Sequence, residues 1–80
     1  MKIQVLGTGC PRCKQLLANV QQAVAETGAE AEIEKVEDIK EIMKFRVLAT
    51  PALAVDGVVK AAGRVLSPDE IRKLLAREER

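Results

Sequence analysis

The feature that most constrains the fold of this chain is the junction at residues 7–13, which reads Gly-Thr-Gly-Cys-Pro-Arg-Cys. Residues 2–6, just before it, are mostly apolar and end at a glycine, which predicts a short β-strand. Proline is well tolerated at the first position of a helix, so Pro11 predicts a helix start. We therefore expect Cys10 and Cys13 where a strand turns into a helix.

Three further elements are predicted in the first half of the chain. Apolar residues recur at the helical period up to Gly28, a good C-terminal stop, which predicts a helix over residues 11–27. Residues 30–36 alternate apolar and charged side chains, which is typical of a half-buried strand, and their charges suit the edge of a sheet. Apolar residues at helical spacing predict a second, shorter helix over residues 37–46.

The second half of the chain predicts a hairpin and a last helix. Residues 52–55 form an unbroken apolar run, as expected of a strand buried on both faces. An Asp-Gly pair joins this run to residues 58–61, which is a strong hairpin signal. Ser67 followed three residues later by Glu70 predicts a capping box at the start of a helix.

These elements follow the order β-α-β-α-β-β-α, which indicates an α/β fold. The first two strands are joined by a helix and should be parallel, whereas the last two form an antiparallel hairpin. We expect a mixed four-stranded sheet flanked by three helices, in a single domain over residues 1–80. Met43 is expected to fill the core, and Phe45 is expected in the core or as a wall near residues 50–51.

Composition excludes several classes of function. With no histidine, a Cys-His or Ser-His nucleophile cannot form, and two cysteines cannot complete a four-ligand Cys/His zinc site. A net charge of +1 and one aromatic residue argue against nucleic-acid binding. No stretch approaches a membrane span or a signal peptide, so we expect a cytoplasmic protein without a membrane partner. No metal and no cofactor are predicted.

The spacing of the cysteines predicts two different roles. The first helical turn has unpaired N–H groups and the positive end of the helix dipole, which would stabilise a Cys10 thiolate beside Arg12. Cys13 lies one turn further along and can close a small disulfide with Cys10. We therefore interpret Cys10 as an exposed nucleophile and Cys13 as a recessed resolving thiol. The alternative is a fixed disulfide or two inert core thiols.

The second notable element is Thr50-Pro51, immediately before the apolar run at residues 52–55. A trans proline marking the strand boundary is one interpretation. A cis bond in a tight turn is the other. Together with the upstream cysteine pair, the placement suggests that this loop packs beside the cysteines.

These motifs, together with the Asp-Gly turn, Gly63 and the leucines of the last helix, resemble those of the thioredoxin superfamily along essentially the whole chain. The short form is similar to the minimal thioredoxin-like and glutaredoxin-like microbial proteins called redox-active disulfide protein 2. The resemblance implies a cis Pro51, a Thr50 backbone that pairs with extended substrate, and Gly63 at the border of the substrate groove. The substrate-contacting positions expected around the cysteines and the proline loop are Gly9, Pro11, Arg12, Thr50, Pro51 and Gly63.

The resemblance also implies an activity and its partners. It implies a thiol–disulfide oxidoreductase, an electron carrier that reduces disulfides in protein substrates through Cys10 and Cys13. Its only redox group would be the reversible disulfide of that pair. Electrons would come from a thioredoxin-reductase-like flavoprotein, and the protein would act as a monomer.

Four features depart from the patterns of related families. Gly9 stands where thioredoxins have tryptophan, and Gln4 stands where they have a buried acid, so proton transfer at Cys13 needs another route. Arg12 stands where glutaredoxins usually have tyrosine, and their Gly-Gly-Asp pattern after the last strand is missing. These differences argue against glutathione binding.

Two other functions use the same motif. Small copper chaperones place two cysteines at a similar loop-to-helix junction, and thiolates suit Cu(I). Such domains end in a strand, whereas this chain ends in a capped helix and has Thr50-Pro51. The other alternative is a protein that binds a partner in one oxidation state without turning it over.

Overall fold

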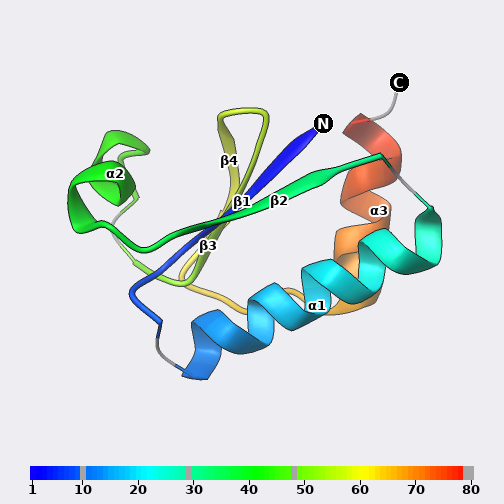
Figure 1. The fold of residues 1–80 in the computed structure, drawn as a ribbon, viewed down its shortest axis with the longest axis horizontal. Coiled ribbons are helices and arrows are strands. Elements are labelled where there is room, and N and C mark those ends of the chain that lie inside the picture. The colour runs from blue at the N-terminus through cyan, green and yellow to red at the C-terminus, as the bar shows by residue number, and fades with distance from the viewer. Residues whose placement is uncertain (10, 29, 48, 79–80) are drawn as a thin grey trace.

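The computed structural model describes residues 1–9, 11–28, 30–47 and 49–78, and within them it shows an α/β fold (Figure 1). In chain order, its elements are β1 (Lys2–Leu6), α1 (Pro11–Thr27), β2 (Glu32–Val36), α2 (Ile39–Lys44), β3 (Ala52–Val55), β4 (Val58–Ala62) and α3 (Pro68–Glu78). The predicted order of elements is confirmed. The strand predicted over residues 30–36 begins two residues later, and the helix predicted over residues 37–46 is shorter at both ends.

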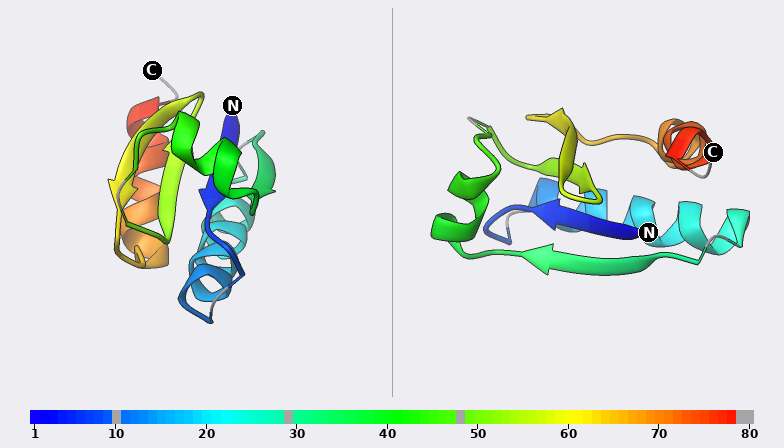
Figure 2. Two further views of the ribbon diagram at one scale, coloured as in Figure 1. Left: turned by 90° about the vertical axis from the view of Figure 1, so that its left-hand side faces the viewer. Right: turned by 90° about the horizontal axis from the view of Figure 1, so that it is seen from above.

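The four strands form one mixed sheet in the order β2-β1-β3-β4. β1 pairs in parallel with β2 and antiparallel with β3, which in turn pairs antiparallel with β4. The charged strand β2 lies at one edge, as predicted, and the hairpin strand β4 lies at the other (Figure 2). The apolar strand β3 is buried along its whole length. β1 therefore lies in the interior of the sheet, between β2 and β3, and its carboxyl end leads to residues 7–13.

The main core lies between one face of the sheet and the helix pair α1 and α3, which run side by side against that face. Ile3 and Val5 of β1 contribute to it because alternate residues of a strand point to the same face. Leu16 and Val20 of α1 meet them from the helix side. The side chain of Asn19 donates to the Leu66 carbonyl oxygen at 2.8 Å, which ties α1 to the segment before α3.

A smaller apolar cluster lies on the opposite face of the sheet. Leu6, Val36 and Ala52 meet Ile42 of α2 there, and Phe45 packs against the cluster while remaining partly exposed. The core role expected for Met43 is wrong, because its side chain is 67% exposed. The reason is the length of α2, which has six residues and presents only Ile42 as a buried side chain.

The ends of the helices follow the local sequence signals. The Ser67 Oγ accepts from the Glu70 backbone N–H at 3.2 Å, and a Glu70 carboxylate oxygen reaches back to the Ser67 backbone N–H at 3.5 Å. This is the predicted capping box of α3. After α1, Gly28 adopts a φ of +66° and donates to the Val24 carbonyl oxygen at 3.0 Å. No helix in the described part of the chain is long and apolar enough to cross a membrane.

Candidate functional site

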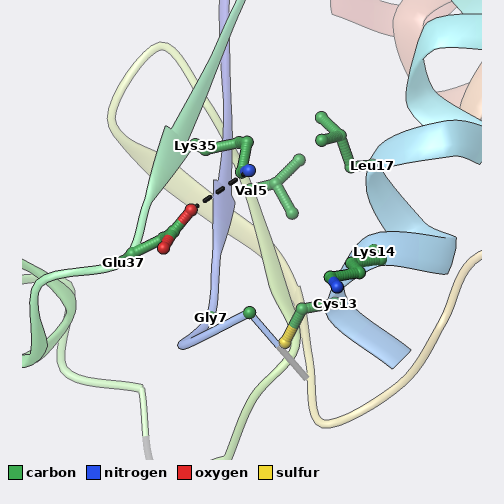
Figure 3. A pocket seen from close by; sticks show the side chains of 8 residues that line it. Val5, Gly7, Cys13, Lys14, Leu17, Lys35 and Glu37 are labelled. Carbon is green, nitrogen blue, oxygen red and sulfur yellow. Dashed lines mark ion pairs between the residues drawn. The ribbon is translucent and has the colours of Figure 1, made fainter. Parts of the chain in front are cut away.

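The site is built around Cys13, in the first turns of α1. Its side chain is 5% exposed, which agrees with the recessed position expected for a resolving cysteine. Figure 3 shows its sulfur pointing from α1 toward the turn that follows β1. Cys10, the expected nucleophile, lies outside the described residues.

Gly7 forms the wall against which Cys13 packs. A Cβ at this position would overlap the Cys13 Sγ and lie 3.0 Å from the Cys13 Cβ. The Gly7 backbone N–H donates to the Val36 carbonyl oxygen at 2.9 Å, which continues the β1–β2 pairing by one residue. A glycine is therefore required here by the close approach of α1 to the sheet.

The Thr50-Pro51 loop also lies close to Gly7. The peptide bond between the two residues is cis, Pro51 is buried and Thr50 is exposed. The Pro51 Cα lies 4.0 Å from the position that a Cβ on Gly7 would take. The structure therefore brings the proline loop beside the Gly7–Cys13 contact.

Gly63 joins the same group of loops. Its backbone N–H donates to the Pro51 carbonyl oxygen at 2.9 Å, directly after the end of β4. Its φ is +75°, and a Cβ added to it would lie 3.0 Å from the Cβ of Ala49. Gly63 thus borders the Thr50-Pro51 loop. Its positive φ and its close contact with Ala49 both disfavour a side chain at this position.

The other expected substrate-contacting residues lie at the entrance to α1. Gly9 has a φ of +86°, which favours glycine, and lines the same small cavity as Cys13. Pro11 is the first residue of α1, and both it and Arg12 are exposed. No acidic residue occupies the first turn of this helix, so Arg12 and the helix N-terminus both favour negative charge there.

A small cavity of about 20 Å³ lies beside Cys13, between α1 and the β1–β2 pair. Its walls are Val5, Gly7, Gly9, Cys13, Lys14, Leu17, Lys35 and Glu37. The Lys35 ammonium pairs with the Glu37 carboxylate at 3.1 Å on the sheet side of the cavity (Figure 3).

Sequence reasoning did not assign Lys14, Lys35 or Glu37 to the site. One signal was available for Glu37, because it follows the end of a strand that runs parallel to β1. The carboxyl ends of neighbouring parallel strands lie at the same edge of a sheet, so Glu37 had to lie near residues 7–13. Lys14 directly follows Cys13, and Lys35 is paired in register with Val5.

Gln4, which stands where the buried acid of related proteins was expected, belongs to another pair of side chains. Its amide nitrogen donates to the Glu34 carboxylate at 3.3 Å, and Lys2 pairs with the same carboxylate at 3.0 Å. The hydrogen bond from Lys2 lowers the pKa of Glu34, and the hydrogen bond to Glu34 raises the pKa of Lys2. Neighbouring residues of a strand point to opposite faces of the sheet. The Lys2–Glu34 pair therefore lies on the face opposite to Lys35 and the cavity.

Within the described ranges, no three Cys, Asp or Glu side chains gather as metal ligands. The chemistry that the described groups can support is therefore that of a thiol, a carboxylate, two ammonium groups and the backbone at the Thr50-Pro51 loop.

Comparison with known proteins shows the family to which the chain belongs. The thioredoxin domain family matches residues 1–76, a range that includes Cys10, Cys13 and the Thr50-Pro51 loop. The chain belongs to the thioredoxin domain family. It is 47% identical over 76 residues to a thioredoxin of Methanothermobacter thermautotrophicus, and the match covers 95% of this chain and 99% of that protein.

A second relative of this thioredoxin domain protein comes from another organism. It is a thioredoxin of Methanocaldococcus jannaschii, 45% identical over 73 residues, with 91% of this chain and 84% of that protein covered. Two probable thioredoxins, from Methanothermobacter thermautotrophicus and Methanothermobacter marburgensis, are 32% and 31% identical over shorter ranges. The resemblance to small thioredoxin-like proteins and the thioredoxin-like fold are therefore confirmed.

Proposed function

We propose that this protein is a dithiol–disulfide oxidoreductase that reduces disulfide bonds in protein substrates with Cys10 and Cys13. The observation that carries the proposal is the packing of Cys13, in the first turns of α1, against Gly7, which in turn lies beside the cis Thr50-Pro51 bond. This arrangement buries one cysteine of the pair. It also brings Gly7 close to Pro51, whose neighbour Thr50 is an exposed residue. Membership of the thioredoxin domain family supports the same class of reaction.

The reaction has two exchange steps. In the first, the Cys10 thiolate attacks one sulfur of the substrate disulfide, forms a mixed disulfide and releases the other substrate sulfur as a thiolate. In the second, Cys13 loses its proton and attacks the Cys10 sulfur. The Cys10–Cys13 bond forms, and the remaining substrate sulfur leaves with the electron pair and takes up a proton. The substrate gains two electrons, and the protein becomes the disulfide.

The helix N-terminus and Arg12 favour the first step. A thiolate, not a thiol, is the attacking group, and both features stabilise negative charge at the start of α1. The absence of an acid in the first turn means that no carboxylate on this turn opposes the effect. Histidine has no part, because the chain contains none.

Substrate binding uses the backbone on either side of the cysteines. The exposed Thr50 beside cis Pro51 offers main-chain groups to an extended substrate strand. Gly63 leaves room beside it because it has no side chain. Pairing through main-chain atoms provides affinity without demanding one substrate sequence. Gly9, Pro11 and Arg12 form the opposite border, at the entrance to α1.

The protein needs a source of electrons, since each cycle leaves the cysteine pair oxidised. We propose that a thioredoxin-reductase-like flavoprotein regenerates the dithiol, with the protein acting as a monomer in the cytoplasm. This protein itself would use no cofactor beyond the reversible disulfide of the cysteine pair.

Reduction of insulin disulfides by the wild type, Cys10→Ser and Cys13→Ser tests this function. The wild type should reduce insulin with dithiothreitol as electron source, and Cys10→Ser should be inactive. Equal rates for the wild type and Cys10→Ser would exclude Cys10 as the nucleophile. An inactive wild type that binds Cu(I) tightly in a one-to-one complex would instead favour the copper-binding alternative.

Trapping experiments test the order of the two cysteines. Cys13→Ser should accumulate mixed disulfides at Cys10 with substrate proteins, because the resolving sulfur is missing. Cys10→Ser should accumulate few, because Cys13 is buried. Equal trapping by both variants would show that the two cysteines do not have separate roles.

A further inference from the structure

The Cys13 step raises a question of proton transfer that the structure addresses. In the proposed reaction, Cys13 must lose a proton before it can attack the mixed disulfide. Its side chain is only 5% exposed, and the Gly7 backbone covers its sulfur. A buried thiol exchanges its proton slowly with bulk water unless an acceptor or a water molecule lies within reach.

The cavity beside Cys13 has the size and lining for such a route. Its volume of about 20 Å³ suits one water molecule, which needs about 10–15 Å³ on this measure and two to four polar partners. Val5 and Leu17 form its apolar walls. The side-chain polar partners available to a water there are the Cys13 sulfur and the three charged side chains that line the cavity.

The charged groups lining this cavity come from two elements. Lys14 comes from α1, while Lys35 and Glu37 lie at the end of β2; the β1 side contributes Val5 and Gly7, which carry no charge. Glu37 is the one carboxylate among the described lining residues, so it is the candidate proton acceptor of this cavity.

The backbone holds Glu37 in this place. The Gly7 N–H bonds to the Val36 carbonyl oxygen at 2.9 Å, so the residue after Val36 lies beside the turn at residues 7–9. One Glu37 oxygen, Oε1, pairs with the Lys35 ammonium at 3.1 Å. The other, Oε2, lies 3.9 Å from the position that a Cβ on Gly9 would take. Lys35 thus holds one oxygen and leaves the other beside the turn that leads to the cysteines.

We propose that Glu37, held by Lys35, accepts the Cys13 proton through a water molecule in this cavity during the resolving step. The inference rests on the proposed function. The proton leaves the Cys13 thiol for the water, the water passes a proton to the Glu37 carboxylate, and the electron pair left on sulfur forms the bond to Cys10. About half of the Glu37 side chain faces solvent, so the carboxylate then returns the proton to bulk water. Glu37 acts here through the water and is a positioning and proton-accepting residue.

The proposal can be tested because the two possible effects of Glu37 on the resolving step have opposite signs. A negative charge near Cys13 disfavours its thiolate, so removing the Glu37 charge would accelerate the resolving step if charge were its only influence. Removing a proton acceptor would slow the same step. Glu37→Gln therefore separates the two roles by the sign of the change in rate.

The experiment follows the reaction of the fully reduced protein with Ellman's reagent in rapid mixing. Attack by Cys10 releases one thionitrobenzoate in the first phase, and attack by Cys13 on the mixed disulfide releases the second. We expect Glu37→Gln to leave the first phase within about twofold of the wild type and to slow the second about tenfold at neutral pH. The difference should shrink as pH rises, because Cys13 then ionises without an acceptor.

Glu34→Gln is the matched control, since it removes a carboxylate from the other face of β2, where Glu34 pairs with Lys2. It should leave both phases unchanged. A second phase in Glu37→Gln that equals or exceeds the wild-type rate overturns the proposal, as does equal slowing by Glu34→Gln. A wild type that shows no second phase would count against the proposed function itself. Because Glu37 is exposed, Glu37→Gln should keep the wild-type unfolding curve, which confirms that the kinetic comparison uses folded protein.

Discussion

Gly7 and Cys13 are packed so closely that the backbone of one covers the sulfur of the other. A Cβ on Gly7 would overlap the Cys13 Sγ, and the same atom would lie 4.0 Å from the Pro51 Cα. The turn after β1 therefore contacts both the helix that carries Cys13 and the proline loop. Any side chain at residue 7 must push these parts of the site away from one another.

Gly7→Ala should destabilise the protein by about 1–3 kcal/mol, the usual cost of an extra carbon in a closely packed site. Urea unfolding of the reduced protein measures the change. Thr8→Ala, at the exposed neighbouring position, should change stability by less than about 0.5 kcal/mol. In a Cys13→Ala background, the cost of Gly7→Ala should fall, since the sulfur that it meets is gone. An undiminished cost in that background would show that the strain arises elsewhere.

Gly63→Ala should also destabilise the protein, for two separable reasons. The φ of +75° costs a residue with a side chain about 1–2 kcal/mol, and the new Cβ meets Ala49 at 3.0 Å. Ala49→Gly removes the second cause and leaves the first. Thermal unfolding of the two single variants and the double variant should therefore show partial rescue. Full additivity of the two changes would contradict the predicted contact.

Ser67→Ala should cost about 1 kcal/mol because the Glu70 backbone N–H loses its acceptor at the start of α3. The loss should appear as a lower urea midpoint with an unchanged slope. Ser67→Asp keeps an acceptor at the cap and should retain most of the stability. If Ser67→Ala and Ser67→Asp lose the same amount, the cap does not stabilise α3.

Ile42 and Met43 are neighbours in α2 with opposite environments. Ile42→Ala should cost about 2 kcal/mol or more because this side chain is 6% exposed and joins α2 to Leu6 and Val36. Met43→Ala should change stability by less than about 0.5 kcal/mol because its side chain is 67% exposed. Chemical unfolding of both variants provides the comparison. A larger loss for Met43→Ala would mean that α2 packs on its other face.

The Lys2–Glu34 pair predicts a pH-dependent difference between the wild type and Glu34→Gln. The pKa of Glu34 is lowered in the folded protein, mainly by the hydrogen bond from Lys2, so its contribution exists above the unfolded pKa and disappears as pH falls through the folded pKa. The pKa of Lys2 is raised, so its contribution disappears as pH rises through the folded value.

The wild type should therefore be more stable than Glu34→Gln around neutral pH. The difference in stability between the two should disappear in strong acid and in strong alkali. Unfolding midpoints measured across pH test this, with high salt as the control, since salt screens exposed pairs. A difference that persists in strong acid would show that the glutamine changes stability by another cause.

Most of the elements could be predicted because their signals are local. The hairpin turn, the capping box and the stop at Gly28 each depend on a few neighbouring residues, and each has the predicted form in the structure. The prediction was wrong for Met43. The spacing of apolar residues predicts which face of a helix they share, but it does not show whether another element packs against that face. In α2, that face is too short to bury more than Ile42.

The sequence by itself determined the β-α-β-α-β-β-α order and the placement of Cys13 near the start of α1, because turn residues, periodicity and caps act over a few positions. Only the tertiary structure decided that Gly7 packs on Cys13 beside Pro51, that Gly63 bonds to Pro51, and that Glu37 and Cys13 line one cavity. These residues are far apart in the chain. The strand order and the register of β1 with β2 and β3 bring them together, and those depend on how the whole apolar surface is buried.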